Sequence, residues 1–161
     1  MRIVDILSED LIVPDVVATA KDQVLAELVD RMVVVRGDID AKVALRVLVE
    51  RERLGSTGVG NGFAIPHGKL PNLRGLVACF ARSAKGVDFG SLDGHPAFLF
   101  LTLLAPEGAA GLHLKALARA SRLFKDADFR RRLLTEPSAK DLWKIISEED
   151  ARLARHDELR E

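Results

Sequence analysis

The sequence predicts a single α/β domain in which a mixed β-sheet is flanked by helices on both faces. A chain of 161 residues suits one domain with one hydrophobic core. Two near-continuous apolar runs, 75–82 (GLVACFAR) and 96–106 (PAFLFLTLLAP), are typical of strands that are buried on both faces of a sheet. Segments with helical spacing both precede and follow these runs, so we expect an α/β sandwich.

Two helices are expected before the apolar runs. Residues 21–35 place apolar side chains on one helical face: Val24, Leu25, Leu28 and Met32. Thr19 followed by Asp22 resembles a capping box at the start of this helix. Residues 40–54 form the second predicted helix, and Gly55 directly after it is typical of a helix C-terminus.

Three helices are expected after the apolar runs. Residues 111–124 show helical spacing of four side chains: Leu114, Leu117, Ala118 and Ser121. Residues 126–134 form a shorter helix. Ser138, three residues before Asp141, is expected to cap a last helix that carries three apolar residues: Leu142, Ile145 and Ile146.

Composition limits the classes of protein to consider. Lys and Arg number 24, and Asp and Glu also number 24, so the formal net charge of +0 argues against a nucleic-acid-binding protein. The single cysteine, Cys79, lies in an apolar run and fits a buried thiol in a reducing cytosol. Residues 1–10 do not form a secretory signal, and no apolar run has the length of a membrane span. We therefore expect a cytoplasmic protein with no membrane span.

The segment 58–69 (GVGNGFAIPHGK) surrounds one histidine, His67, with glycines and a proline. Pro66 restricts the backbone directly before the histidine, after a possible short strand at 63–65. A solvated surface histidine needs no such frame, so we expect His67 to be held in one orientation for a partner. Three glycines alternate through the loop and permit positive φ or close approach of another backbone or a ligand: Gly58, Gly60 and Gly62.

Several common chemistries do not match this loop. A nucleotide P-loop requires Ser or Thr after Gly-Lys, and here Leu70 follows. A dinucleotide-binding loop follows a strand, whereas this one follows a predicted helix. The sequence has no G-x-S-x-G hydrolase motif, no CxxC and no paired histidine spacing, so we expect neither a metal nor a cofactor. His95 is expected in a turn and His156 in solvent.

The remaining chemistry makes His67 the nucleophile. A neutral imidazole attacks phosphorus and forms a labile covalent intermediate. Phosphoryl transfer needs cations and hydrogen-bond donors around the transferring group. Arg51, at the end of the second predicted helix, and His113, at the start of a later one, are candidates for this role. Simpler roles stay open: a helix-end charge for Arg51, an ordinary helical residue for His113 and a turn residue for His67.

Residues 51–70 (RERLGSTGVGNGFAIPHGKL) resemble the active-site region of the IIA components of the phosphoenolpyruvate-dependent phosphotransferase system. The similarity covers residues 3–148 and is closer to the fructose/mannitol-type family, within it to the nitrogen-regulatory branch. The resemblance implies that His67 accepts a phosphoryl group on Nε2 from a phosphorylated HPr-like carrier protein. It implies that Arg51 and His113 flank the phosphohistidine.

Two departures from the family pattern bear on function. Phe63 stands where Ile or Val is more common, which we interpret as a packing change. We expect no attached IIB, IIC or HPr-like domain, which favours the regulatory branch over direct sugar transport. We expect the IIA domain to span residues 1–150, followed by a charged tail, residues 151–161, that frays.

The leading hypothesis is a nitrogen-regulatory phosphocarrier that controls target proteins through the phosphorylation state of His67. One alternative is a fructose- or mannitol-type IIA component that passes phosphate to a separate IIB protein. Another is an interaction module whose His67 is never phosphorylated. The sequence leaves open the regulatory targets, the signalling state and the oligomeric state.

Overall fold

Two long antiparallel strands, β5 (Val77–Val87) and β6 (Ala97–Pro106), form the centre of a six-stranded sheet in the computed structural model, which describes residues 1–160. Both are buried along most of their length, as the continuous apolar runs predict. Cys79 of β5 is fully buried opposite Thr102 of β6, and burial raises the pKa of its thiol to about 12. The predicted buried thiol is confirmed.

Four short strands complete the sheet. β1 (Ile12–Val13) pairs parallel with β5, and β3 (Phe63–Ala64) and β4 (His67–Leu70) both pair parallel with β6. β2 (Gly58–Gly60) pairs antiparallel with β3, which gives the order β1-β5-β6-β3-β2 with β4 also on β6. The mixed sheet is confirmed, but the glycine-rich segment contributes strands on both sides of FAI rather than a plain loop.

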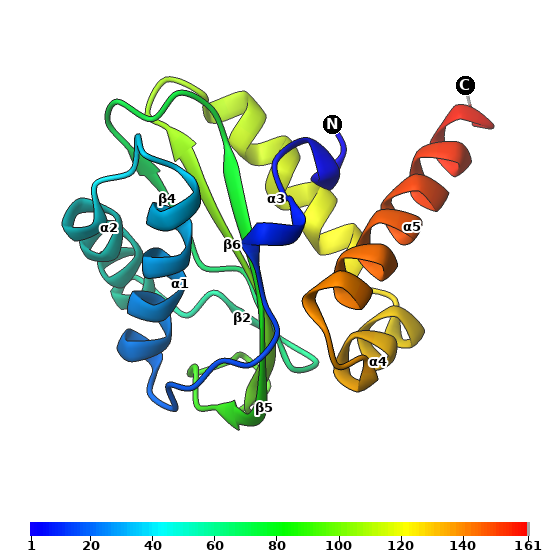
Figure 1. Cartoon of the computed structure of the whole chain (residues 1–161), viewed down its shortest axis with the longest axis horizontal. Coiled ribbons are helices and arrows are strands. Elements are labelled where there is room, and N and C mark those ends of the chain that lie inside the picture. The colour runs from blue at the N-terminus through cyan, green and yellow to red at the C-terminus, as the bar shows by residue number, and fades with distance from the viewer. Residues whose placement is uncertain (161) are drawn as a thin grey trace.

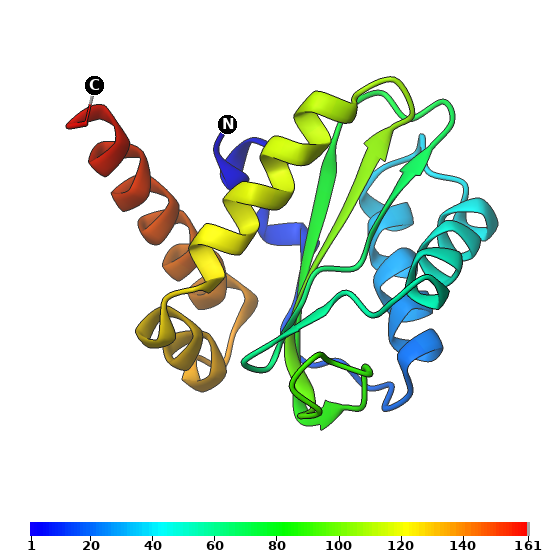
Figure 2. The ribbon, with the colours of Figure 1, turned by 180° about the vertical axis from the view of Figure 1, so that it is seen from behind.

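Helices cover both faces of the sheet (Figures 1 and 2). α1 (Lys21–Val35) and α2 (Ala41–Arg53) lie on one face. α3 (Ala110–Phe124), α4 (Ala127–Thr135) and α5 (Ala139–Glu158) lie on the other. The predicted α/β sandwich is therefore confirmed. Among residues 1–160, no helix combines the length and apolar character needed to cross a bilayer.

At the helix starts the structure confirms one predicted capping residue, Ser138, shows a second at Asp40 that was not predicted, and differs from the prediction at the start of α1. The side chains of Asp40 and Ser138 accept hydrogen bonds from the third residue beyond each of them, at the starts of α2 and α5. The capping box predicted from Thr19 and Asp22 is wrong. The cap position of α1 belongs to Ala20, whose side chain makes no such bond, because a bridge between Ala20 and Asp88 keeps the chain extended up to that point.

α3 buries a different face from the one that its apolar spacing indicates. Leu114, Ala118 and Ser121 are exposed, and Leu117 is only partly buried. The buried face is made of His113, Ala116, Arg119, Ala120, Leu123 and Phe124. Two alanines on this face let the helix lie close to the sheet, so small residues rather than the leucines define the packed side. This rotation turns His113 inward.

The charged C-terminal segment is helical rather than frayed. α5 continues to Glu158, and Leu153 is buried. Asp157 accepts a hydrogen bond from Arg122 of α3 at 2.8 Å, and its pKa is lowered by this bond. Asp157 of this segment thus pairs with α3, and the segment stays helical. The expected domain boundary at residue 150 stays a prediction.

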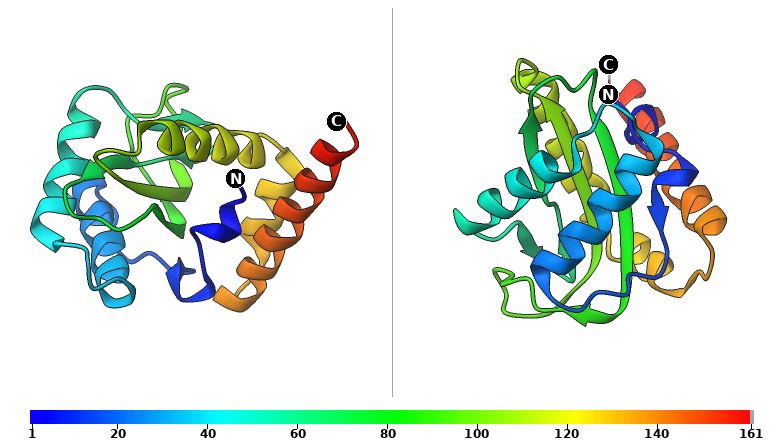
Figure 3. Two further views of the ribbon diagram at one scale, coloured as in Figure 1. Left: turned by 90° about the horizontal axis from the view of Figure 1, so that it is seen from above. Right: turned by 60° about the vertical axis from the view of Figure 1, so that its left-hand side comes forward.

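The N-terminal segment packs against α3 and the C-terminal helix α5. Two short 3₁₀ helices, η1 (Ile3–Asp5) and η2 (Glu9–Leu11), contact α5, and Figure 3 shows this N-terminal segment between the sheet and α5. The buried carboxylate of Asp150 accepts the amide of Val4 at 3.1 Å and pairs with Arg119 at 2.7 Å.

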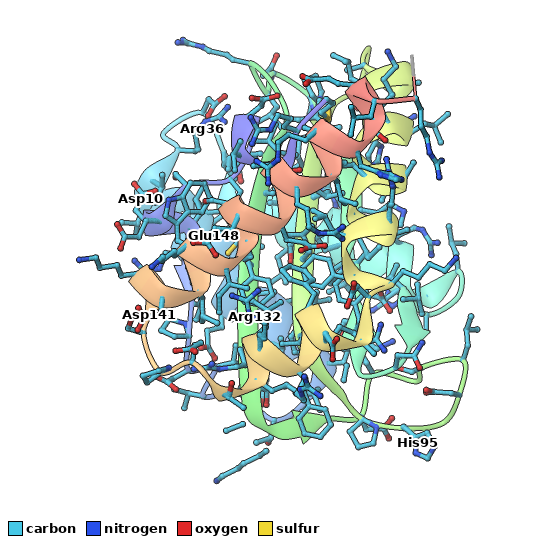
Figure 4. All side chains as sticks on the ribbon, turned by 90° about the vertical axis from the view of Figure 1, so that its right-hand side faces the viewer. Asp10, Arg36, His95, Arg132, Asp141 and Glu148 are labelled. Atoms are coloured by element: carbon cyan, nitrogen blue, oxygen red, sulfur yellow. The ribbon has the colours of Figure 1, made fainter. Side chains whose placement is uncertain are left out.

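α4 and α5 also pack together. Arg132 of α4 lies 3.8 Å from Glu148 of α5, and both side chains are labelled in Figure 4. These two side chains are about half exposed, so the pair contributes at most a fraction of the packing energy between the helices.

Candidate functional site

The glycine-rich segment forms a tight hairpin that leads into the histidine. Gly60 and Gly62 adopt φ values of 99° and 75°, and Asn61 between them has φ 57°. Gly58 has no positive φ, but a Cβ at this position would collide with Ser91. Two of the three glycines are thus required by conformation and the third by close approach, as expected.

His67 is the first residue of β4, and a hydrogen bond from its Nδ1 fixes the orientation of the imidazole. Its Nδ1 lies 2.8 Å from the carbonyl oxygen of Ile65, which can only accept, so the ring proton is on Nδ1. Leu103 of β6 donates its amide to the carbonyl of Pro66 at 2.9 Å and fixes the backbone next to the ring. His67 therefore has one defined tautomer, with an unprotonated Nε2.

The surroundings of His67 favour the neutral imidazole. Burial lowers its pKa below the ordinary value of 6.5, and the positive charge of Arg51 also acts to lower it. The hydrogen bond to Ile65 and the negative charge of Glu52 act in the opposite direction without reversing the shift. At neutral pH the ring is a nucleophile rather than a cation.

The second predicted histidine lies next to the first. The ring centroids of His67 and His113 are 5.5 Å apart, and the ring planes meet at 71°. His113 is 6% exposed, and its Nε2 is buried without a hydrogen-bond partner among the described residues. Burial, followed by the charges of His67 and Lys69, lowers the pKa of His113. A buried unpaired nitrogen beside a nucleophile is a position for a ligand or a water molecule.

Arg51, from α2, lies in the same site as the two histidines. It lies in the last turn of the helix, and its Nη1 donates a hydrogen bond to the carbonyl of Gly55 at 2.8 Å. This bond serves the simpler role of completing the helix C-terminus. The guanidinium nevertheless acts electrostatically on His67, so the two roles coexist.

A cavity of about 690 Å³ joins the three predicted residues. His67, His113 and Arg51 all line it, and they come from β4, α3 and α2 respectively. α2 and α3 cover opposite faces of the sheet (Figure 1), so the cavity lies where both helices reach β4. Leu54 and Leu114, which are 84% and 69% exposed, give it an apolar border.

The sequence did not indicate three buried or half-buried side chains as part of the site: Lys21, Glu52 and Thr57. Glu52 is buried and binds Thr57 and Lys21. A charged residue near a helix end suggests a solvated side chain, which is the usual case for glutamate. The signal that could have found Glu52 is its spacing, because it continues the buried row of Ala44 and Leu48 at intervals of four.

The remaining histidines lie outside the site. His95 is exposed directly after a turn, between β5 and β6, and Figure 4 shows it at the periphery of the molecule. His156 is exposed on α5. Within residues 1–160, no group of three His, Cys, Asp or Glu side chains is placed to hold a metal ion.

The solved structures that share this fold define the class of protein. The crystal structure of the nitrogen regulatory protein IIA-Ntr from Neisseria meningitidis aligns with a TM-score of 0.82 and 33% identity, over 88% of this chain and 97% of that one. The structure of IIA mannitol from Escherichia coli aligns with a TM-score of 0.74 over 87% and 98% of the two chains, at 19% identity, and supports the fold alone. The fold is that of a IIA domain.

The sequence model of the family described as "Phosphoenolpyruvate-dependent sugar phosphotransferase system, EIIA 2" matches residues 5–149, and the chain belongs to this family. A nitrogen regulatory protein of Bradyrhizobium diazoefficiens is 41% identical over 91% of this chain and 95% of its own length. The fructose-specific EIIABC component of Bacillus subtilis is 35% identical over 93% of this chain but only 24% of its own length. The resemblance stated from residues 51–70, including the nitrogen-regulatory branch, is confirmed.

Proposed function

We propose that this protein is a nitrogen-regulatory phosphocarrier that accepts a phosphoryl group on Nε2 of His67 from a phosphorylated HPr-like protein. The observation that carries the proposal is the hydrogen bond from Nδ1 to Ile65, because it leaves Nε2 as the unprotonated nitrogen of a cavity-lining histidine. Membership of a family of phosphoryl-transfer relay proteins supports this chemistry. The reaction draws on phosphoenolpyruvate, so we place the protein in the cytoplasm.

The geometry of the site supports the following transfer step. The lone pair of Nε2 attacks phosphorus, and the bond between phosphorus and the carrier's side chain breaks, with its electron pair returning to the carrier. The proton on Nδ1 stays in its bond to Ile65. Arg51 would offset the charge on the phosphoryl oxygens, and the unpaired Nε2 of His113, when protonated, would donate a hydrogen bond to one of them.

The regulatory role rests on the relatives. Proteins named nitrogen regulatory protein from B. diazoefficiens and Pseudomonas aeruginosa are 41% and 35% identical over 91% of this chain. We infer that the chain controls target proteins through the phosphorylation state of His67.

One specific observation favours a second candidate, a sugar-type IIA component that passes phosphate to a IIB protein. The fructose-specific EIIABC component of B. subtilis is 35% identical over 93% of this chain. An E. coli mannitol IIA protein with the same fold has been solved in complex with phosphorylated IIB, at 18% identity to this chain. Loss of phosphate from the modified chain upon addition of a fructose-type IIB protein would select this candidate.

Phosphorylation is tested by intact mass after incubation with enzyme I, an HPr-like protein and phosphoenolpyruvate, followed by mapping of the modified residue. We expect one phosphoryl group on His67, and none in the His67→Ala variant. An unchanged mass for a folded wild-type chain would leave the interaction module as the function. His95→Ala is a matched control, because it removes an exposed histidine outside the cavity.

A further inference from the structure

Glu52 lies directly after Arg51 in the last turn of α2 and is 7% exposed. Its carboxylate accepts the amide of Thr57 at 3.2 Å and also accepts the Thr57 hydroxyl. Its Oε2 lies 2.8 Å from Nζ of Lys21, which itself lies over the ring of Phe89. This carboxylate takes no part in the transfer described above.

A short series of hydrogen bonds leads from Glu52 to the nucleophile. Glu52 holds Thr57 at the start of the glycine-rich segment. The carbonyl of Thr57 accepts the amide of Ile65 at 3.0 Å, across the hairpin. The carbonyl of Ile65 then accepts Nδ1–H of His67 at 2.8 Å. The two ends of this series are a buried carboxylate and the imidazole whose tautomer defines Nε2 as the reactive atom.

The last turn of α2 also binds the chain just before the glycine-rich segment, at Gly55. Arg51 donates to the carbonyl of Gly55, two residues before the threonine that Glu52 binds. Adjacent side chains of α2 therefore hydrogen-bond to both ends of the short segment 55–57. Through these two bonds, α2 fixes the position of Arg51 relative to the segment that leads to His67.

We propose that Glu52 is a positioning residue for His67, acting through Thr57 and Ile65 to hold the imidazole in the tautomer and orientation required for phosphoryl transfer. The inference rests on the proposed function in one respect, namely that His67 is the acceptor. Lys21 pairs with the buried carboxylate at 2.8 Å, and such a partner is needed because an unpaired charge at this depth is strongly unfavourable. Glu52 is too buried to contact a docking carrier protein.

The test variant is Glu52→Gln, which keeps the shape of the side chain but removes its charge and one acceptor. Because a misplaced nucleophile can reduce transfer by about a hundredfold, we expect kcat to fall between about tenfold and a hundredfold while KM for the phosphorylated carrier is unchanged. Thr57→Val should lower kcat in the same direction, and Thr57→Ser, which keeps the hydroxyl, should restore it. A kcat equal to that of the wild type in folded Glu52→Gln would overturn the proposal.

A matched control separates positioning from stability. Glu27 of α1 also accepts two backbone amides, but they belong to Val17 and Ala18 and not to the hairpin. Glu27→Gln should lower the melting temperature and leave kcat unchanged. Equal losses of kcat in the Glu27 and Glu52 variants would show a general effect of stability and would contradict the proposal.

A second readout does not require phosphorylation. ¹⁵N spectra of the unmodified protein report which ring nitrogen of His67 carries the proton. We expect Nδ1–H in the wild type and a larger share of Nε2–H in Glu52→Gln; an unchanged tautomer would overturn the inference. A wild-type chain that shows this tautomer but accepts no phosphate would instead refute the proposed function alone.

Discussion

The rings of His67 and His113 meet edge to face with their centroids 5.5 Å apart, although one residue begins a strand and the other lies in a helix on the opposite side of the sheet from α2. His67 has its Nδ1 committed to Ile65, whereas the Nε2 of His113 is buried and unpaired among the described residues. The pair thus presents one nucleophilic nitrogen and one nitrogen available to a ligand. This difference underlies the predictions for the site.

Replacing Arg51 should affect phosphoryl transfer more than stability. Arg51→Ala removes a charge near the developing phosphoryl oxygens, an effect worth about a hundredfold in rate, but only one hydrogen bond at a helix end, worth less than about 1 kcal/mol. Single-turnover phosphorylation and thermal unfolding measure the two effects. Arg53→Ala, in the same turn but exposed, is the control. An unchanged rate with a lower melting temperature would make Arg51 purely structural.

His113→Ala should slow modification of His67 without abolishing it, because His113 would donate a hydrogen bond and not carry the phosphoryl group. We expect a rate loss of about tenfold, which corresponds to the loss of one hydrogen bond, and a shorter lifetime of the phosphohistidine. His113→Gln keeps a hydrogen-bond donor, so its phosphorylation rate should lie between those of the wild type and His113→Ala. His156→Ala provides the control. Phosphate mapped to His113 in the wild type would contradict the assignment.

Stability should decrease as the solution becomes acidic. Burial lowers the pKa of both His67 and His113 below 6.5, so below about pH 6.5 the unfolded chain binds protons that the folded chain does not. The free energy of unfolding therefore falls from about pH 6.5 until the pH passes the folded-state pKa values.

Thermal unfolding between about pH 8 and about pH 5 measures this trend, which should be weaker in the double variant His67→Gln/His113→Gln. Identical pH dependence in the wild type and the double variant would show that these two histidines are not responsible.

Phosphorylation should change which partners bind at the cavity. A phosphoryl group adds about −1.5 to −2 charges, and desolvating it in a contact bordered by Leu54 and Leu114 is costly without partner cations. Targets that lack such cations should bind the unphosphorylated protein and His67→Ala, and should bind His67→Asp poorly. Pull-downs with the three proteins measure this preference. Equal binding to all three would indicate a simple relay without a switch.

Features that depend on neighbouring residues were predicted well from the sequence, whereas features that depend on remote contacts were not. The central strands and the positions of the five α-helices within residues 1–160 followed from apolar runs, periodicity and turn residues. The predicted capping of α1 and the frayed tail were wrong, because each depended on a remote contact, with Asp88 in one case and with Arg122 in the other. β1, β2 and β4 were missed because strands so short have too few residues to show an alternating pattern.

The sequence by itself determined that a glycine- and proline-framed histidine follows a helix that carries Arg51 near its end, since turn chemistry and helical periodicity depend on neighbours along the chain. Only the tertiary structure showed the bond to Ile65 that leaves Nε2 of His67 free, the nitrogen that the family resemblance implied. It also decided that α3 turns His113 inward and that Glu52 is buried in contact with Lys21 and Thr57. The physical reason is that hydrogen bonds and burial at the site join α1, α2, the hairpin and α3, whose relative positions are set by packing on the sheet and not by local sequence.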